Sequence, residues 1–188
     1  MYFDLKNRIY VVTGASGGIG SALVNLLNKE GAELFLIDTD QTSLDQLKKE
    51  QATHQNQNYF INSNLKDFKE ITDNLQKPIS GIIHLAGQLE SDNVTTSKKP
   101  IWERAIQNNL TNAYDIIENL IPFFDKNIIG KIILTSSLAY RRGGFDFIPY
   151  TASKGGITGL VRAYSRKLAP EILVNGLAPG IIDTKMPK

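Results

Sequence analysis

The chain has 188 residues, of which 41% are hydrophobic, and a formal net charge of +2. This length suits one domain spanning 1–188 with a sizeable core, and so small a charge does not favour nucleic acid as a partner. Cysteine is absent and there are two histidines, which excludes disulfides and a thiol nucleophile and indicates no metal site. No apolar run approaches about twenty residues, so we expect a cytoplasmic protein that does not contact a membrane.

The N-terminal region has the pattern of a buried strand, a tight turn and a helix. Ile9–Val12 is a short β-branched run, and an amphipathic helix is predicted over Ile19–Lys29. In the glycine-rich turn between them, Gly14 permits the turn, Gly18 lets the backbone approach a phosphate, and Gly20 lets the helix pack closely. The N-terminus of this helix would then face a pyrophosphate. A flexible glycine turn without a ligand is the alternative.

A second strand is predicted at Glu33–Ile37, and Asp38 follows it about twenty positions past the glycines. A carboxylate at this place suits a hydrogen bond to a ribose 2′-hydroxyl and repels a 2′-phosphate. No Arg or Lys follows at once, and position 17 is Gly rather than a basic residue. The sequence therefore favours NAD(H), with NADP(H) as the less favoured cofactor. Alternatively, Asp38 begins a turn or caps the next helix.

Strands and helices alternate along the rest of the chain. Strands are predicted at 59–62, 81–85, 131–136 and 172–175, helices at 43–50, 67–75, 101–124 and 150–168, and polar loops at 51–58 and 88–99. This order predicts an α/β fold, a three-layer doubly wound parallel sheet with helices on both faces. Ligands of such sheets bind outside the carboxyl ends of the strands. Four residues fall just past predicted strand ends: Asp38, Ala86, Ser137 and Pro179.

Tyr150 and Lys154 are four residues apart, so a helix places both side chains on one face. An ammonium group beside a phenol favours the phenolate. We therefore expect Lys154 to lower the pKa of Tyr150 from its usual ~10 toward the working range of a general acid/base. Such a pair is more often surface packing. The glycine-rich turn and Ser137 upstream favour the catalytic interpretation here.

Taken in order, these motifs resemble the short-chain dehydrogenase/reductase family over about residues 6–184, in the branch similar to 3-oxoacyl-carrier-protein reductases. Residues 13–20 match its cofactor motif, Thr-Gly-x-x-x-Gly-x-Gly. Asn64-Leu65 replaces an Asp-Val pair that contacts adenine, and residues 84–87, His-Leu-Ala-Gly, replace Asn-Asn-Ala-Gly. Residues 109–111 match the segment with the catalytic Asn, and Ser137 precedes Tyr150 by thirteen positions. Residues 175–184 resemble the segment that closes on the nicotinamide.

The resemblance implies an NAD-dependent oxidoreductase that interconverts a ketone and a secondary alcohol. It implies Tyr150 as the general acid/base, helped by Lys154, which can also bind the nicotinamide ribose. Ser137 would hydrogen-bond the substrate oxygen, and Asn109 would hold a water that links Lys154 to solvent. The implied cofactor-binding residues are Gly14, Ser16, Gly17, Gly18, Ile19, Gly20, Asp38, Asn64, Leu65, Ala86, Gly87, Tyr150, Lys154, Pro179, Gly180, Ile182 and Thr184.

Two features depart from the family pattern. His84 replaces an Asn, and we expect it to pack or hydrogen-bond below the site rather than act chemically. The family's C-terminal substrate loop, last helix and last strand are absent from this sequence. A dinucleotide-binding protein without turnover and a truncated form of a longer dehydrogenase therefore stay open as alternatives. The family pairs its two long helices across a two-fold axis, so we expect a homodimer through 101–124 and 150–168, with a tetramer as the alternative.

Overall fold

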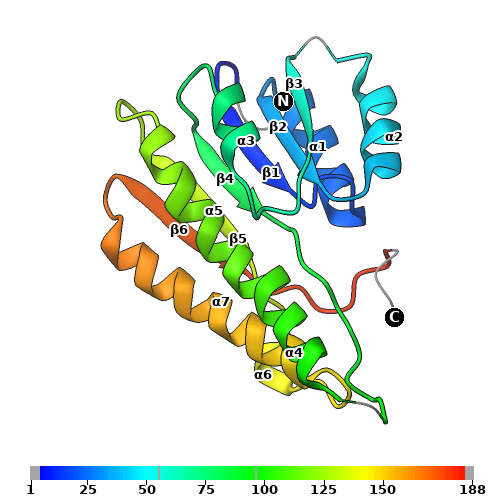
Figure 1. Cartoon of the computed structure of the whole chain (residues 1–188). Coiled ribbons are helices and arrows are strands. Elements are labelled where there is room, and N and C mark those ends of the chain that lie inside the picture. The colour runs from blue at the N-terminus through cyan, green and yellow to red at the C-terminus, as the bar shows by residue number, and fades with distance from the viewer. Residues whose placement is uncertain (1–4, 55, 96, 185–188) are drawn as a thin grey trace.

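The computed structural model describes residues 5–54, 56–95 and 97–184, which form a parallel sheet between two layers of helices (Figure 1). The sheet has six strands in the order β3-β2-β1-β4-β5-β6, and each neighbouring pair is parallel. The strands are β1 (Ile9–Thr13), β2 (Glu33–Asp38), β3 (Asn58–Asn62), β4 (Gly81–His84), β5 (Gly130–Thr135) and β6 (Ile172–Leu177). The prediction of a doubly wound parallel sheet is confirmed.

Helices cover both faces of the sheet. The α-helices are α1 (Gly18–Lys29), α2 (Gln41–Gln51), α3 (Lys69–Asn74), α4 (Lys99–Ala105), α5 (Asn112–Leu120), α6 (Ala139–Arg142) and α7 (Ile148–Lys167). Side chains of α1 and α2 share a core with one face, and those of α3, α5 and α7 share a core with the other. Within the described part of the chain, none of these helices has the length and apolar character needed to cross a membrane.

The two cores explain the apolar strand patterns. Because successive strand residues point to opposite faces, Val11 belongs to the same core cluster as Ile116 of α5 and Ile157 of α7. Val12 belongs to the other cluster, with Val24 of α1 and Leu47 of α2. A strand buried on both faces needs apolar residues at consecutive positions rather than alternating ones. This is why the central strands are easily predicted.

The predicted helix over 101–124 is not a uniform α-helix. After α4, the chain forms a π-helical turn, η1 (Ile106–Thr111), before α5 begins, and it ends in a 3₁₀ turn, η2 (Ile121–Phe123). Pro122 lies in η2, where its missing N–H and its ring prevent the α-helix from continuing. The prediction located the helical segment but missed the wide turn at its centre.

The segment before α7 also differs from the prediction. A short helix, α6, lies between Ser137 and Tyr150, where none was expected. α7 begins at Ile148, two residues before the predicted start, because Pro149 fits the first turn of a helix. Because α7 begins at Ile148, Tyr150 lies within its first turn. Farther along the chain, β6 extends to Leu177 rather than ending at Asn175.

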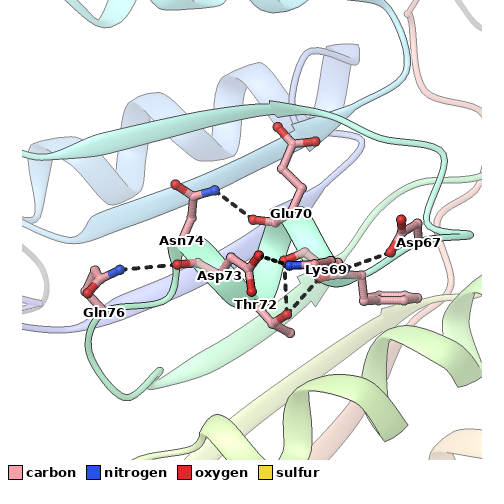
Figure 2. Close-up of polar contacts among 8 residues, drawn as sticks. Asp67, Lys69, Glu70, Thr72, Asp73, Asn74 and Gln76 are labelled. Atoms are coloured by element: carbon pink, nitrogen blue, oxygen red, sulfur yellow. Dashed lines mark hydrogen bonds and ion pairs between the residues drawn. The ribbon is translucent and has the colours of Figure 1, made fainter.

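Local side-chain bonds hold the short helix α3 in place, as Figure 2 shows. Asp67 accepts a hydrogen bond from the N–H of Lys69 (2.9 Å), and the Lys69 ammonium lies 2.6 Å from the Asp73 carboxylate. Asn74 donates to the carbonyl of Glu70 (2.7 Å). A six-residue helix is too short to be stable by itself, so these exposed contacts and the buried Ile71 on its inner face together fix it.

Candidate functional site

The glycine-rich turn between β1 and α1 has room for glycine alone at two positions. Gly14 has a φ of +65°, and a Cβ there would lie 2.8 Å from the backbone nitrogen of Ala86. A Cβ on Gly20 would overlap the Gly14 carbonyl oxygen. Gly17, the N-cap of α1, offers no side-chain cap, and the first turn of α1 has no acidic residue. The exposed N–H groups and the positive end of the helix dipole therefore suit an anionic group such as a pyrophosphate.

Asp38 joins the end of β2 to this turn. Its Oδ2 accepts hydrogen bonds from the Ser16 backbone N–H (3.0 Å) and the Ser16 hydroxyl (2.7 Å). Its Oδ1 accepts from the N–H of Thr39 at 2.8 Å, as a turn-forming Asp would. Helix α2 is capped by Asp40, which accepts from the Ser43 N–H at 3.1 Å. The alternative role of helix cap therefore belongs to Asp40, and the half-buried Asp38 carboxylate lies beside the predicted phosphate site.

Beside the adenine end of the predicted site, Asn64 and Leu65 follow β3 in a tight bend. Leu65 is buried and has a φ of +61°. Asn64 accepts a hydrogen bond from the Lys66 N–H (3.1 Å), and its carbonyl accepts one from the side chain of Asn112 (3.3 Å). A hollow of about 420 Å³ opens here, lined by Thr39, Asn62, Ser63, Asn64, Asp67 and Glu70.

Tyr150, Ser137 and Lys154 meet at the carboxyl edge of the sheet. The side chain of Ser137 lies within hydrogen-bonding reach of the Tyr150 phenol, and its Oγ accepts from the Ala139 N–H at 3.2 Å. The Lys154 ammonium lies 5.6 Å from the centre of the Tyr150 ring and donates to the Thr135 carbonyl at 2.9 Å. The three side chains that the sequence grouped together are thus neighbours in space.

The pKa of Tyr150 differs from the prediction. Burial raises it, because a phenolate loses solvation, and the hydrogen bond to Ser137 opposes this increase. We expected Lys154 to lower the pKa of Tyr150, and that expectation is wrong for this structure. The reason is geometric: the ammonium group is directed at the carbonyl of Thr135 rather than at the phenol oxygen.

Lys154 is itself buried, with 3% of its surface exposed. Burial lowers its pKa to about 8, because an ammonium group loses solvation there. A Cβ on Gly87 would lie 3.0 Å from Lys154 Nζ and 2.7 Å from Asn109 Oδ1. Gly87 therefore leaves the space in which the amide of Asn109 and the ammonium of Lys154 come together.

Asn109 lies in the π turn and is fully buried. Its Oδ1 accepts from the Gln88 N–H (2.8 Å), and its Nδ2 donates to the Gln88 carbonyl (3.1 Å). This pair of bonds fixes the chain where it leaves β4. Sequence reasoning missed Gln88, since its contribution is made by the backbone and no side-chain pattern indicates it.

His84, the last residue of β4, is fully buried beneath the site. Its Nδ1 hydrogen-bonds the hydroxyl of Thr13 at 2.8 Å, and that hydroxyl also accepts from the Ala86 N–H at 3.3 Å. Burial and the nearby charge of Lys154 lower the pKa of His84 to about 3. The expectation that His84 packs and hydrogen-bonds below the site is confirmed.

The segment after β6 crosses the carboxyl edge of the sheet (Figure 1). The Pro179 carbonyl accepts from the Leu138 N–H at 2.8 Å, next to Ser137. At its far end, Thr184 lies against the glycine-rich turn, since a Cβ on Gly18 would lie 2.5 Å from Thr184 Cγ2. Between them, Gly180 and Ile182 are exposed. This segment therefore extends from the neighbourhood of Ser137 to the glycine-rich turn.

The chain is similar to known proteins along nearly its whole length. The chain is 29% identical over 189 residues to a 3-oxoacyl-[acyl-carrier-protein] reductase of Thermotoga maritima, covering 97% of this chain and 77% of that protein. A glucose/ribitol-type short-chain dehydrogenase/reductase structure from Brucella melitensis has a TM-score of 0.90 at 30% identity, covering 99% and 77% of the two chains. A short chain dehydrogenase structure from Shigella flexneri, in complex with NADP, has a TM-score of 0.83 at 26% identity, covering 97% and 81%. The short chain dehydrogenase family model matches residues 8–188, and the chain is therefore an oxidoreductase of the short-chain dehydrogenase/reductase family.

Proposed function

We propose that this protein uses NAD(H) to interconvert a ketone and a secondary alcohol, with Tyr150 as the general acid/base. The observation that carries the proposal is the contact of the Tyr150 phenol with Ser137 beside the buried Lys154 ammonium. This cluster lies at the same sheet edge as the uncapped N-terminus of α1. Ligands of doubly wound sheets bind at this edge.

The bound nicotinamide supplies hydride chemistry, and the protein manages one proton and the geometry. In reduction, the Tyr150 hydroxyl donates its proton to the substrate oxygen, which Ser137 holds by a hydrogen bond. Burial raises the pKa of Tyr150, so the phenol is protonated at neutral pH and ready to donate. In oxidation, Tyr150 accepts the alcohol proton as a phenolate, and the hydrogen bond to Ser137 stabilises that negative charge.

Asn109 is proposed to hold a water between Lys154 and solvent. Both of its amide atoms bond to Gln88, yet each keeps one further hydrogen-bonding position, because an amide oxygen has two lone pairs and an amide nitrogen two N–H groups. Asn109 Oδ1 and Lys154 Nζ lie around the same small volume at Gly87. One water can therefore bond to both groups.

Turnover separates this proposal from the alternative of a dinucleotide-binding protein without activity. NADH oxidation is followed with a panel of ketones that includes 3-oxoacyl thioesters, the substrate class suggested by the Thermotoga maritima relative. Turnover of any of these substrates supports the enzyme. NADH binding without turnover across the panel would favour the binding protein.

Asp38 is expected to give NADH a lower Kd than NADPH. Its carboxylate, held beside the glycine-rich turn by Ser16, repels a 2′-phosphate and accepts from a 2′-hydroxyl. Fluorescence titration measures both affinities, and Asp38→Ala should bring them closer. Asp45→Ala, an exposed acidic residue of α2, controls for the loss of one negative charge. Tighter binding of NADPH by the unaltered protein would overturn the preference.

We further propose a homodimer through α5 and α7. The apolar side chains along α7 and its C-cap do not support it, because they belong to or pack against the core of the same chain: Ile157, Leu160, Val161, Tyr164 and Leu168. Support comes instead from Tyr114 on α5, 48% exposed, and from Gly159 on α7, whose Cβ would meet nothing within 4 Å. Light scattering at micromolar concentration should give twice the monomer mass, and Gly159→Glu should give a monomer. A monomeric wild type with full activity would reject the dimer.

A further inference from the structure

Asp92 is a buried carboxylate outside the predicted site. It lies in the segment between β4 and α4, and 4% of its surface is exposed. Its N–H donates to the carbonyl of Asp146 at 2.8 Å. Its Oδ1 accepts from the N–H of Ile148 at 3.2 Å, across 56 positions of sequence. Both bonds reach the start of α7.

The N-terminus of α7 has no cap of its own. The N-cap residue, Phe147, has no side-chain hydrogen bond, the first turn contains no acidic residue, and Pro149 has no N–H to donate. The first N–H groups of a helix need outside partners. Asp92 supplies one by accepting from Ile148, the first residue of the helix.

The charge of Asp92 also matches this position. A carboxylate at a helix N-terminus is stabilised by the positive end of the helix dipole. Among the described residues, no ion pair includes Asp92, so the helix end is the positive group that its charge meets. A buried charge needs such compensation to be tolerated.

We propose that Asp92 is a positioning residue, which sets the first turn of α7 and through it the hydroxyl of Tyr150. This inference rests on the proposed function. Tyr150 is two residues beyond Ile148 in the same turn, and its hydroxyl must reach both Ser137 and the substrate oxygen. The segment that carries Asp92 is itself anchored at Gln88 by Asn109. Asn109 and Asp92 therefore hold one segment against the site at two points.

Three substitutions separate geometry from charge. Asp92→Asn keeps the accepting oxygen and loses the charge, Asp92→Glu keeps the charge and moves the oxygen by one methylene, and Asp92→Ala removes both. A displacement of about 1 Å can cost about 100-fold in rate. We expect kcat to fall about 10- to 100-fold in Asp92→Ala, less in Asp92→Glu, and within about threefold in Asp92→Asn, since Asn caps helices as well as Asp does. The KM for NADH should not change.

Hydrogen exchange over residues 147–154 gives a readout that does not need turnover. Exchange should be faster in Asp92→Ala and close to wild type in Asp92→Asn, while peptides of α1 are unchanged. Asp125→Ala is the matched control, because Asp125 accepts from the Asn127 N–H at 2.8 Å in the loop that precedes β5. This control should retain the wild-type kcat.

The outcomes that overturn the proposal are distinct from failure of the proposed function. If the wild type has no turnover, the enzyme proposal fails, and the exchange data still decide whether Asp92 sets the first turn of α7. Unchanged exchange at 147–154 in Asp92→Ala overturns the positioning role. If Asp92→Ala does not fold, Asp92→Asn is compared with Asp92→Glu. A kcat of Asp92→Glu equal to or above that of Asp92→Asn overturns the positioning role.

Discussion

Tyr150→Phe is expected to lower kcat by a factor of ~10² to 10⁴, the contribution of a positioned general acid/base. Phenylalanine keeps the half-buried ring beside Lys154 and removes the hydroxyl that is proposed to transfer the proton. The affinity for NADH should be unchanged within about twofold, because only the hydroxyl is lost. Steady-state kinetics and fluorescence titration measure the two quantities.

Tyr59→Phe is the control for this substitution. Tyr59 lies on β3, at the edge of the sheet, and stacks on Phe35 with ring centroids 4.3 Å apart. It takes no part in the proposed site. It should therefore keep the wild-type kcat. Near-normal turnover by Tyr150→Phe would show that another group moves the proton.

Acid is expected to destabilise the protein through His84. The pKa of His84 is about 3 in the folded chain and ~6.5 in an unfolded one. Above pH ~6.5, neither state binds the proton and stability is complete. As the pH falls from ~6.5 toward 3, only the unfolded state binds it, so the free energy of unfolding decreases. Each pKa unit is worth about 1.4 kcal/mol, which gives a total on the order of 5 kcal/mol.

Urea unfolding at pH 7.5 and pH 5 measures the effect. Between these values, wild type should lose about 2 kcal/mol more than His84→Asn, because the Asn side chain at position 84 does not titrate. Acidic groups also contribute to acid unfolding. The quantity compared is therefore the change in the free energy of unfolding between pH 7.5 and pH 5, in wild type and in His84→Asn. His54→Asn, which replaces the other histidine of the chain, is the matched variant for comparison. Equal pH dependence of His84→Asn and wild type would contradict the assignment.

The sequence sufficed for the sheet and for most of the cluster, for different physical reasons. Buried parallel strands need consecutive apolar residues, so strands such as 9–12 are visible in the sequence itself. Tyr150 and Lys154 are paired by helix geometry, and the structure confirms that they are neighbours. Ser137 was assigned to the site through the resemblance, and in the structure its side chain lies beside the Tyr150 phenol.

The features that sequence reasoning missed depend on long-range contacts. The pKa of Tyr150 is set by burial and by the direction in which the Lys154 side chain points, and neither follows from a spacing of four. Asp92 reaches Ile148 across 56 positions, beyond any local pattern. Helix α6 has four residues, too few for a periodicity to be recognised.

The π turn makes this enzyme sensitive to the length of one helix rather than to its composition alone. From α4 through the π turn into α5, buried residues recur at intervals of four: Ile101, Ala105, Asn109, Ala113 and Ile117. In a straight α-helix of 3.6 residues per turn, each interval of four advances about 40°, and four intervals about 160°. The extra residue of the π turn takes back about 100° of this rotation. Loss of one residue from 106–111 would therefore turn either α4 away from α7 or Asn109 away from Gln88. Relatives with an insertion or a deletion in the segment that corresponds to 106–111 should differ in their active sites.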